Sequence, residues 1–107
     1  IILLGINDWA EGNNAATIDT AYKDLIDTLN GLDNTIEMHC ISPLTASGDN
    51  AALDTIRTNI ATMCGTRGFA THIAGKTILT YPTDFHDTAH PNNSGHTNLY
   101  DEVKGLF

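Results

Sequence analysis

Apolar residues follow two patterns along this chain, and the two patterns alternate. Short segments at residues 1–4, 35–41 and 68–74 are apolar at most positions. Short apolar runs bounded by turn residues are typical of strands covered on both faces of a parallel sheet. The segments between and after them place apolar residues every three or four positions, which is the spacing of one helix face. The predicted order is therefore strand, helix, strand, helix, strand, loop and helix.

The helical spacing is clearest between Thr17 and Gly31, where charged and polar residues fill the other positions. We expect Gly31 to end this helix. A second helix is expected after a cap at Asp49 or Asn50, and the last helix is expected to begin near Asn93. The apolar positions of the first helix are Ile18, Ala21, Tyr22, Leu25, Ile26 and Leu29.

Strands that alternate with helices predict an α/β domain, in which right-handed crossovers join parallel strands. The length of 107 residues is enough for one small domain and not for two. Residues 1–4, with the sequence IILL, are apolar enough for a central strand that is paired on both sides. Because no strand precedes them here, we expect one edge of this strand to be open, which invites aggregation or pairing with another polypeptide.

Composition narrows the possible partners. Apolar residues make up 41% of the chain and charged residues 17%, which is typical of a globular rather than a disordered domain. The formal net charge of −8 disfavours nucleic acid and anionic membranes, since both attract clustered positive charge. No apolar run approaches the roughly 20 residues of a membrane-spanning helix. Cys40 and Cys64 lie in apolar segments and are expected as buried free thiols, although one bridge between them remains possible.

The first polar cluster, GINDW at residues 5–9, directly follows the first predicted strand. Sites in α/β proteins form just beyond the carboxyl ends of strands. Gly5 can take a tight conformation there, and the Asn7 side chain could donate its N–H to a developing oxyanion. A simple turn, with Asn7 and Asp8 capping the local backbone, explains the same residues.

The second cluster is DTAHPNNSGH at residues 87–96. Asp87 and His90 stand three positions apart, so the carboxylate can hold Nδ1–H of the imidazole and leave Nε2 free as a base. An Asn-rich turn before the last helix is the simpler alternative. The second alternative is a metal site that uses His86, Asp87, His90 and His96. Pro91 disfavours the helix that such a site needs. His39 and His72 lie within predicted strands and are expected as satisfied interior or rim residues.

Taken together and in this order, the two clusters resemble the SGNH hydrolases, also called the GDSL esterase/lipase family. Gly5, Asn7 and Asp8 match the family's Gly-x-Asn-Asp block, and Asp87 and His90 match its Asp-x-x-His-Pro block. The resemblance implies a flavodoxin-like three-layer α/β/α sandwich and a serine esterase that needs no metal or organic cofactor. It also implies that Asn7 donates to the oxyanion, His90 is the base and Asp87 is the acid that orients it.

The chain departs from the family pattern at the nucleophile. The family's serine lies in a Gly-Asp-Ser motif after its first strand, and neither Ser42, Ser47 nor Ser94 has that context. Ser94 is expected to cap the last helix. The resemblance therefore implies that residues 1–107 are the C-terminal portion of a single SGNH-like domain, holding its third to fifth strands. The N-terminal part, in the same or a separate chain, would supply the serine, and this segment alone is expected to be inactive.

The loops after the strands bear on the substrate. They are polar, as in DWAEGNN and PLTASGDN, and do not form long apolar lids. This favours an ester of a carbohydrate, best an O-acetyl group, with Gly5, Asp8 and Trp9 lining the substrate site. Trp9 could stack on a sugar ring or serve as a partly buried packing residue. The alternatives are a non-catalytic carbohydrate-binding module with the same fold, or a lipase or thioesterase of the same family.

Overall fold

The structure, a computed structural model, describes residues 1–106 and is built around a parallel sheet. The middle strand, β2, pairs with β1 on one side and with β3 on the other. Ile2 stands opposite Cys40, which in turn stands opposite His72. Both pairings are parallel, as the alternation of strands and helices predicts. The strands are β1 (Ile2–Leu3), β2 (Met38–Ile41) and β3 (Ala70–Ile73).

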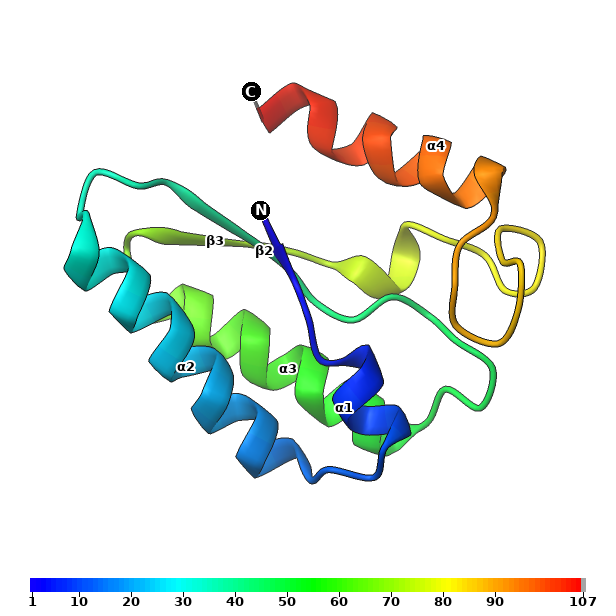
Figure 1. Cartoon of the computed structure of the whole chain (residues 1–107), viewed down its shortest axis with the longest axis horizontal. Helices are drawn as coiled ribbons and strands as arrows, with labels where there is room; N and C mark the ends of the chain where they lie inside the picture. Colours follow the sequence, from blue (N-terminus) through cyan, green and yellow to red (C-terminus); the bar gives the residue numbers. More distant parts are fainter. Residues whose placement is uncertain (107) are drawn as a thin grey trace.

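Helices lie on both faces of this sheet. Figure 1 shows α2 and α3 on one face and α4 on the other, so the described chain has three layers. Within residues 1–106, none of the helices is both long and apolar enough to cross a bilayer. The helices are α1 (Ile6–Ala10), α2 (Ala15–Leu32), α3 (Ala51–Gly65) and α4 (Asn93–Val103), with short 3₁₀ turns at η1 (Gly75–Thr77) and η2 (Lys104–Leu106).

The main core lies between the sheet and the helices α2 and α3. These helices supply their apolar faces, as the helical spacing predicts. Asn50 caps α3 by accepting from the backbone N–H groups of Ala52 and Leu53, so the second of the two expected caps is used. The fully or nearly buried residues of this core are Ile18, Tyr22, Ile26, Met38, Cys40, Leu53, Ile56, Ile60, Met63 and Cys64.

The end of α2 differs from the prediction. The helix continues through Gly31 to Leu32, and the chain leaves it at Asp33, which has an extended backbone. A glycine inside a helix costs only about 1 kcal/mol relative to alanine, so neighbouring residues can override it. Here Asp33 forms the stop, because its carboxylate accepts from the backbone N–H of Thr35 at 2.9 Å.

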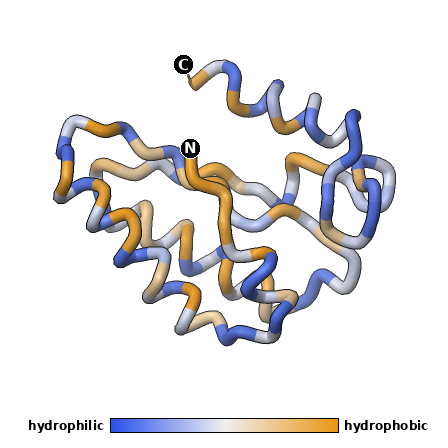
Figure 2. The backbone as a smooth tube through the Cα atoms, in the orientation of Figure 1, coloured by the Kyte–Doolittle hydropathy of each residue, from blue (hydrophilic) through white to orange (hydrophobic). Residues whose placement is uncertain are grey.

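β1 is an edge strand of the described sheet and is shorter than the predicted run. No strand within residues 1–106 pairs with its outer side. The side chains in and beside the strand are only partly covered, with 52% of Ile1, 36% of Leu3 and 49% of Leu4 exposed. Figure 2 shows this strongly hydrophobic stretch at the N-terminus. Residues 1–4 therefore have the apolar character of a central strand without its neighbours.

Both cysteines and the two strand histidines lie in the interior or at its rim. Cys40 and Cys64 are buried free thiols, as expected, and burial raises the pKa of Cys64 to about 12, so its thiol stays protonated. His39 is buried and His72 partly buried, which confirms their interior or rim placement. They are not fully satisfied, because Nδ1 of His39 and Nε2 of His72 have no hydrogen-bond partner within residues 1–106. Burial also lowers the pKa of His72.

Candidate functional site

The loops that carry the candidate residues leave the sheet at one edge. Because the strands are parallel, their carboxyl ends point the same way, and each is followed by a segment of interest (Figure 1). β1 leads into α1, β2 into a loop over residues 42–50, and β3 into a long segment over residues 74–92. Both polar clusters predicted from the sequence therefore lie at this edge.

Asp87 and His90 are paired. Nδ1 of His90 lies 2.8 Å from Oδ2 and 3.0 Å from Oδ1 of Asp87. An ionised carboxylate can only accept hydrogen bonds, so Nδ1 carries the proton in this pair and the lone pair of neutral His90 lies on Nε2. The His90 side chain is 73% exposed, and Nε2 makes no hydrogen bond within residues 1–106. This imidazole is held on one nitrogen and available as a base on the other.

The backbone of the turn helps to keep Asp87 ionised. Its Oδ1 accepts from the backbone N–H groups of Ala89 and His90, each at 2.9 Å. These two donors, followed by the His90 ring, lower the pKa of Asp87 from its ordinary 3.8 to about 2. Asp87 therefore remains an acceptor throughout the pH range in which His90 can act as a base.

This pairing predicts an unusually acidic titration. Because the folded-state pKa of Asp87 is depressed, its contribution to stability is present above the ordinary value of 3.8 and is lost as the pH falls towards 2. We expect the side-chain carboxyl carbon of Asp87 to titrate near pH 2 in a ¹³C NMR experiment, and nearer its ordinary value in urea. A midpoint near 4 in the folded protein would show that the turn is not formed.

The two sides of the turn are joined by backbone contacts. The N–H of His86 donates to the carbonyl of His90 at 2.8 Å, and Phe85 and Pro91 form an isolated antiparallel bridge. Phe85 is buried in a second, smaller core with Leu44 and Leu79. The Asp87/His90 turn is thus the exposed tip of a loop whose sides are fixed to the fold.

The segment after β1 forms a short helix rather than the expected turn. Gly5 precedes α1 with φ 102°, in the left-handed region that favours glycine, and it is buried against Pro43 and Ile56. Asn7 lies in the first turn of α1 and is exposed. Neither Asn7 nor Asp8 caps the local backbone through its side chain, so the capping alternative is wrong. No hydrogen bond within residues 1–106 joins Asn7 to the Asp87/His90 turn.

The structure assigns roles to two of the three serines. Ser42 is buried, and its Oγ accepts from the N–H of Gly75 and donates to a carbonyl of β3. Oγ of Ser94 donates to Asp84, and the cap of α4 is Asn92, so the expectation that Ser94 caps this helix is wrong. Ser47 is exposed, and its backbone N–H donates to the carbonyl of Thr88 at 2.8 Å. Ser47 therefore lies beside the Asp87/His90 turn.

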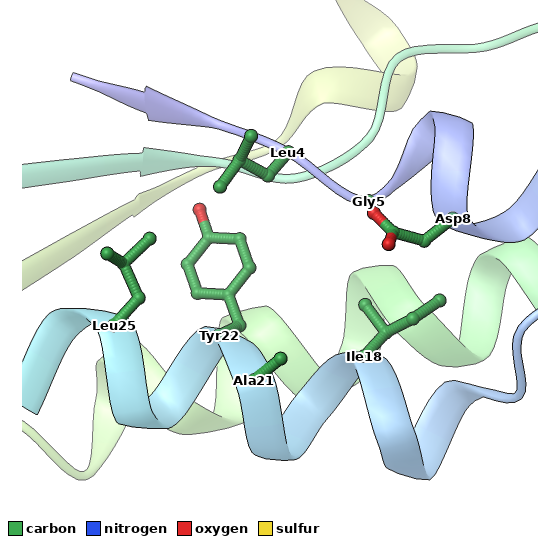
Figure 3. A pocket seen from close by; sticks show the side chains of 7 residues that line it. All are labelled: Leu4, Gly5, Asp8, Ile18, Ala21, Tyr22 and Leu25. Carbon is green, nitrogen blue, oxygen red and sulfur yellow. The ribbon is translucent and has the colours of Figure 1, made fainter.

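A hollow of about 180 Å³ lies between β1 and α2 (Figure 3). Asp8 and Gly5 stand at one end of it, and Tyr22 lies between Leu4 and Leu25. The hydroxyl of Tyr22 donates to the carbonyl of Ile2 at 3.3 Å, and burial raises the pKa of this phenol well above its ordinary value. Trp9 takes no part in this lining and packs against the main core. Of the expected substrate-site residues, Gly5 and Asp8 thus line a hollow, whereas Trp9 is a packing residue.

A second hollow surrounds the histidines of the last loop. It is open, and its lining includes His86, His90 and His96. Within residues 1–106, however, no group of three or more His, Cys, Asp or Glu side chains is placed to hold a metal ion. These histidines therefore share a surface without forming the ligand set that the metal alternative requires.

Arg57 is a residue of this edge that sequence reasoning missed. It is buried, and its Nε and Nη2 donate to the carbonyls of Pro43 and Leu44 at 2.9 and 2.7 Å. Its guanidinium also binds both carboxylate oxygens of Asp49, and Nη1 binds Asp54, each at 2.7 Å. Arg57 therefore fixes the 42–50 loop, which touches the Asp87/His90 turn through Ser47. The sequence offers no signal for this, because an arginine on a helix is usually solvated.

The same fold occurs in a known carbohydrate esterase. No family model matches the sequence, and no curated protein matches it. The crystal structure of a carbohydrate esterase family 3 from Talaromyces cellulolyticus has a TM-score of 0.82 over 97% of this chain, with 17% sequence identity. The chain covers 54% of that structure, so it spans about half of its length. The α/β fold with a parallel sheet predicted from the sequence is therefore confirmed, and it is shared with a carbohydrate esterase structure.

Proposed function

We propose that this chain is the C-terminal part of an SGNH-type serine esterase and carries its base and one oxyanion donor. The observation that supports this most is the Asp87–His90 pair, which leaves Nε2 free at the carboxyl edge of the sheet. The resemblance of both polar clusters to the SGNH blocks and the fold shared with a carbohydrate esterase support it as well. In this proposal His90 is the general base, Asp87 orients it, and Asn7 donates to the oxyanion.

The proposed reaction proceeds through an acyl-enzyme. A serine hydroxyl attacks the ester carbonyl carbon while Nε2 of His90 takes its proton. The carbonyl oxygen becomes an oxyanion, to which the side-chain N–H of Asn7 donates. When the oxyanion collapses, the C–O bond to the alcohol breaks and His90 returns the proton to the leaving alcohol. Water then attacks the acyl carbon with His90 as base, which releases the acid and restores the serine.

The serine would come from the N-terminal part of the domain, docked at the open edge of β1. Three observations support this placement. The outer side of β1 lacks a strand partner within residues 1–106, the side chains of Leu3 and of its neighbours Ile1 and Leu4 are exposed, and the chain spans about half of the esterase structure with the same fold. A strand added parallel to β1 would end at the same edge of the sheet, next to Gly5 and Asn7. The hollow between β1 and α2 would receive an apolar side chain of that part.

The substrate proposed is an ester on a carbohydrate, with an O-acetyl group as the best candidate. The loops at the carboxyl edge are polar, and His90 is widely exposed, which suits a hydrated substrate rather than a lipid chain. The structure that shares the fold is itself described as a carbohydrate esterase. Trp9 packs against the core, so sugar binding would rest on polar contacts more than on stacking at this residue.

Covalent labelling tests the proposal. We expect a serine-directed phosphonate to label the complete protein that contains this chain, at a serine outside residues 1–107. The His90→Ala variant should abolish this labelling. The isolated chain is expected to hydrolyse p-nitrophenyl acetate no faster than free imidazole does.

Two other results would contradict parts of this assignment. Labelling that disappears in Ser47→Ala would place the nucleophile within this chain, beside Thr88. Carbohydrate binding without labelling or turnover would instead identify a non-catalytic module that keeps the fold.

A further inference from the structure

We propose that Asp84 is a positioning residue for the Asp87/His90 turn, because it fastens the base of the loop to the first turn of α4. Its meaning for catalysis rests on the function proposed above, whereas its effect on the turn does not. Asp84 lies three residues before Asp87 in the chain, but it is buried, with 6% of its surface exposed, while the Asp87 side chain is 47% exposed. The two carboxyl groups therefore have different tasks.

The Asp84 side chain joins the segment before the Asp87/His90 turn to the helix that follows the turn. Its Oδ2 accepts from the backbone N–H of Thr80 at 2.8 Å, on the side that enters the loop. Its Oδ1 accepts from Oγ of Ser94 at 3.1 Å, on the helix that follows the loop. A buried carboxyl group is costly unless such donors satisfy it, so the chain is held where both donors can reach it.

The backbone at Asp84 makes a second connection. Its carbonyl accepts from the N–H of Asn92 at 2.9 Å. The Asn92 side chain donates to the carbonyl of Thr83 and accepts from the N–H of Gly95. Gly95 also lies so close that a Cβ there would stand 2.3 Å from the carbonyl oxygen of Asp84. The loop base and the start of α4 are thus in direct backbone contact, which only a glycine at residue 95 permits.

The exposed Asp87/His90 turn depends on these contacts of Asp84. Asp87 and His90 are both on the surface, and no buried side chain of their own holds them in place. Proton transfer needs Nε2 of His90 within hydrogen-bond distance of the serine hydroxyl, and an error of about 1 Å can cost about 10²-fold in rate. Fastening both ends of the loop to α4 limits such errors before a substrate binds.

Three variants test whether the hydrogen bonds of the Asp84 side chain position the turn. Asp84→Ala removes both acceptors and leaves the Thr80 N–H and the Ser94 hydroxyl without a partner. Asp84→Asn keeps the shape, since its carbonyl oxygen can accept from Thr80 and its amide can donate to Ser94, whose hydroxyl can also accept. Ser94→Ala removes only the side-chain connection to α4. We therefore expect a large effect for Asp84→Ala, a smaller one for Ser94→Ala and a near-normal turn in Asp84→Asn.

The geometry of the turn can be measured by NMR in the complete protein that contains this chain. In Asp84→Ala we expect the midpoint of the Asp87 carboxyl titration to move from about 2 towards its ordinary 3.8. The ¹⁵N shifts of His90 should also move from the Nδ1–H tautomer towards the Nε2–H form that free imidazole side chains prefer. Ile60→Val serves as a control, because it loosens the main core without touching the loop. We expect it to leave both Asp87 and His90 unchanged.

An unchanged titration and tautomer in a folded Asp84→Ala variant would overturn the proposal. If that variant does not fold, Ser94→Ala decides, since a normal turn without the side-chain connection to α4 overturns the proposal equally. None of these measurements uses esterase activity. A displaced turn in a protein without esterase activity would therefore support the positioning role and count against the proposed function alone.

Discussion

In the complete protein, if it is the esterase proposed above, His90→Ala is expected to lower kcat by about 10⁴-fold or more, with little change in overall stability. In the proposed mechanism the variant removes the group that takes the serine proton and returns it to the leaving alcohol, so both halves of the reaction lose their proton carrier. The side chain is 73% exposed, so its removal leaves no cavity in a core. Single-turnover kinetics with an activated ester, together with the unfolding midpoint in urea, would measure both effects.

Asp87→Asn should produce a loss of about 10⁴-fold in kcat, because the amide can still contact Nδ1 but can hold the imidazole in the wrong tautomer. His96→Ala is the matched control, since His96 lines the same open hollow, has no carboxylate partner within residues 1–106, and should change kcat far less. If His90→Ala keeps kcat within about tenfold of the parent, another residue is the base. If His96→Ala matches the loss in His90→Ala, the assignment between the two histidines is wrong.

The parts of the fold that the sequence predicts are those that depend on local pattern. The spacing of apolar residues predicts three strands, three longer helices and a parallel sheet. It does so because burial imposes its own spacing on each element separately. Gly31 fails as a stop signal since a glycine in a helix is only mildly unfavourable, and the bonds made by Asp33 decide the end. The open edge of β1 is also foreseeable, because residues 1–4 are more apolar than an edge strand needs.

In the candidate site, too, local features are predictable from the sequence and contacts between distant residues are not. Asp87 and His90 are close in the chain, so their spacing alone brings the carboxylate and the imidazole together. The bonds that hold their loop and the neighbouring 42–50 loop connect distant positions. Arg57 reaches Pro43 across fourteen residues, and Oγ of Ser94 reaches Asp84 across ten. Contacts of this kind depend on tertiary packing, and no period or motif in a single sequence encodes them.

Arg57→Met is expected to lower the free energy of unfolding by about 3 kcal/mol. Methionine can fill much of the space, but it leaves the carbonyls of Pro43 and Leu44 without the Arg57 donors. The Asp49 carboxylate would keep only the Thr45 hydroxyl as a side-chain donor. A buried ion pair stripped of one partner is worse than no pair, because the remaining charge stays poorly solvated. Urea denaturation should show a lower midpoint with an unchanged slope.

The pH dependence of this loss identifies its cause. Hydrogen bonding to Arg57 lowers the pKa of Asp49, so the stability from this pair is present above the ordinary pKa of 3.8 and is lost as the pH falls through the lowered value. The difference in unfolding free energy between the parent and Arg57→Met should therefore shrink in acid. Arg67→Met is the control, because Arg67 also binds an aspartate through two nitrogens, but its partner Asp27 lies on the surface. If the two variants lose equal stability, or the loss from Arg57→Met is the same at pH 7 and pH 3, burial of the Arg57–Asp49 pair is not what holds the 42–50 loop against the Asp87/His90 turn.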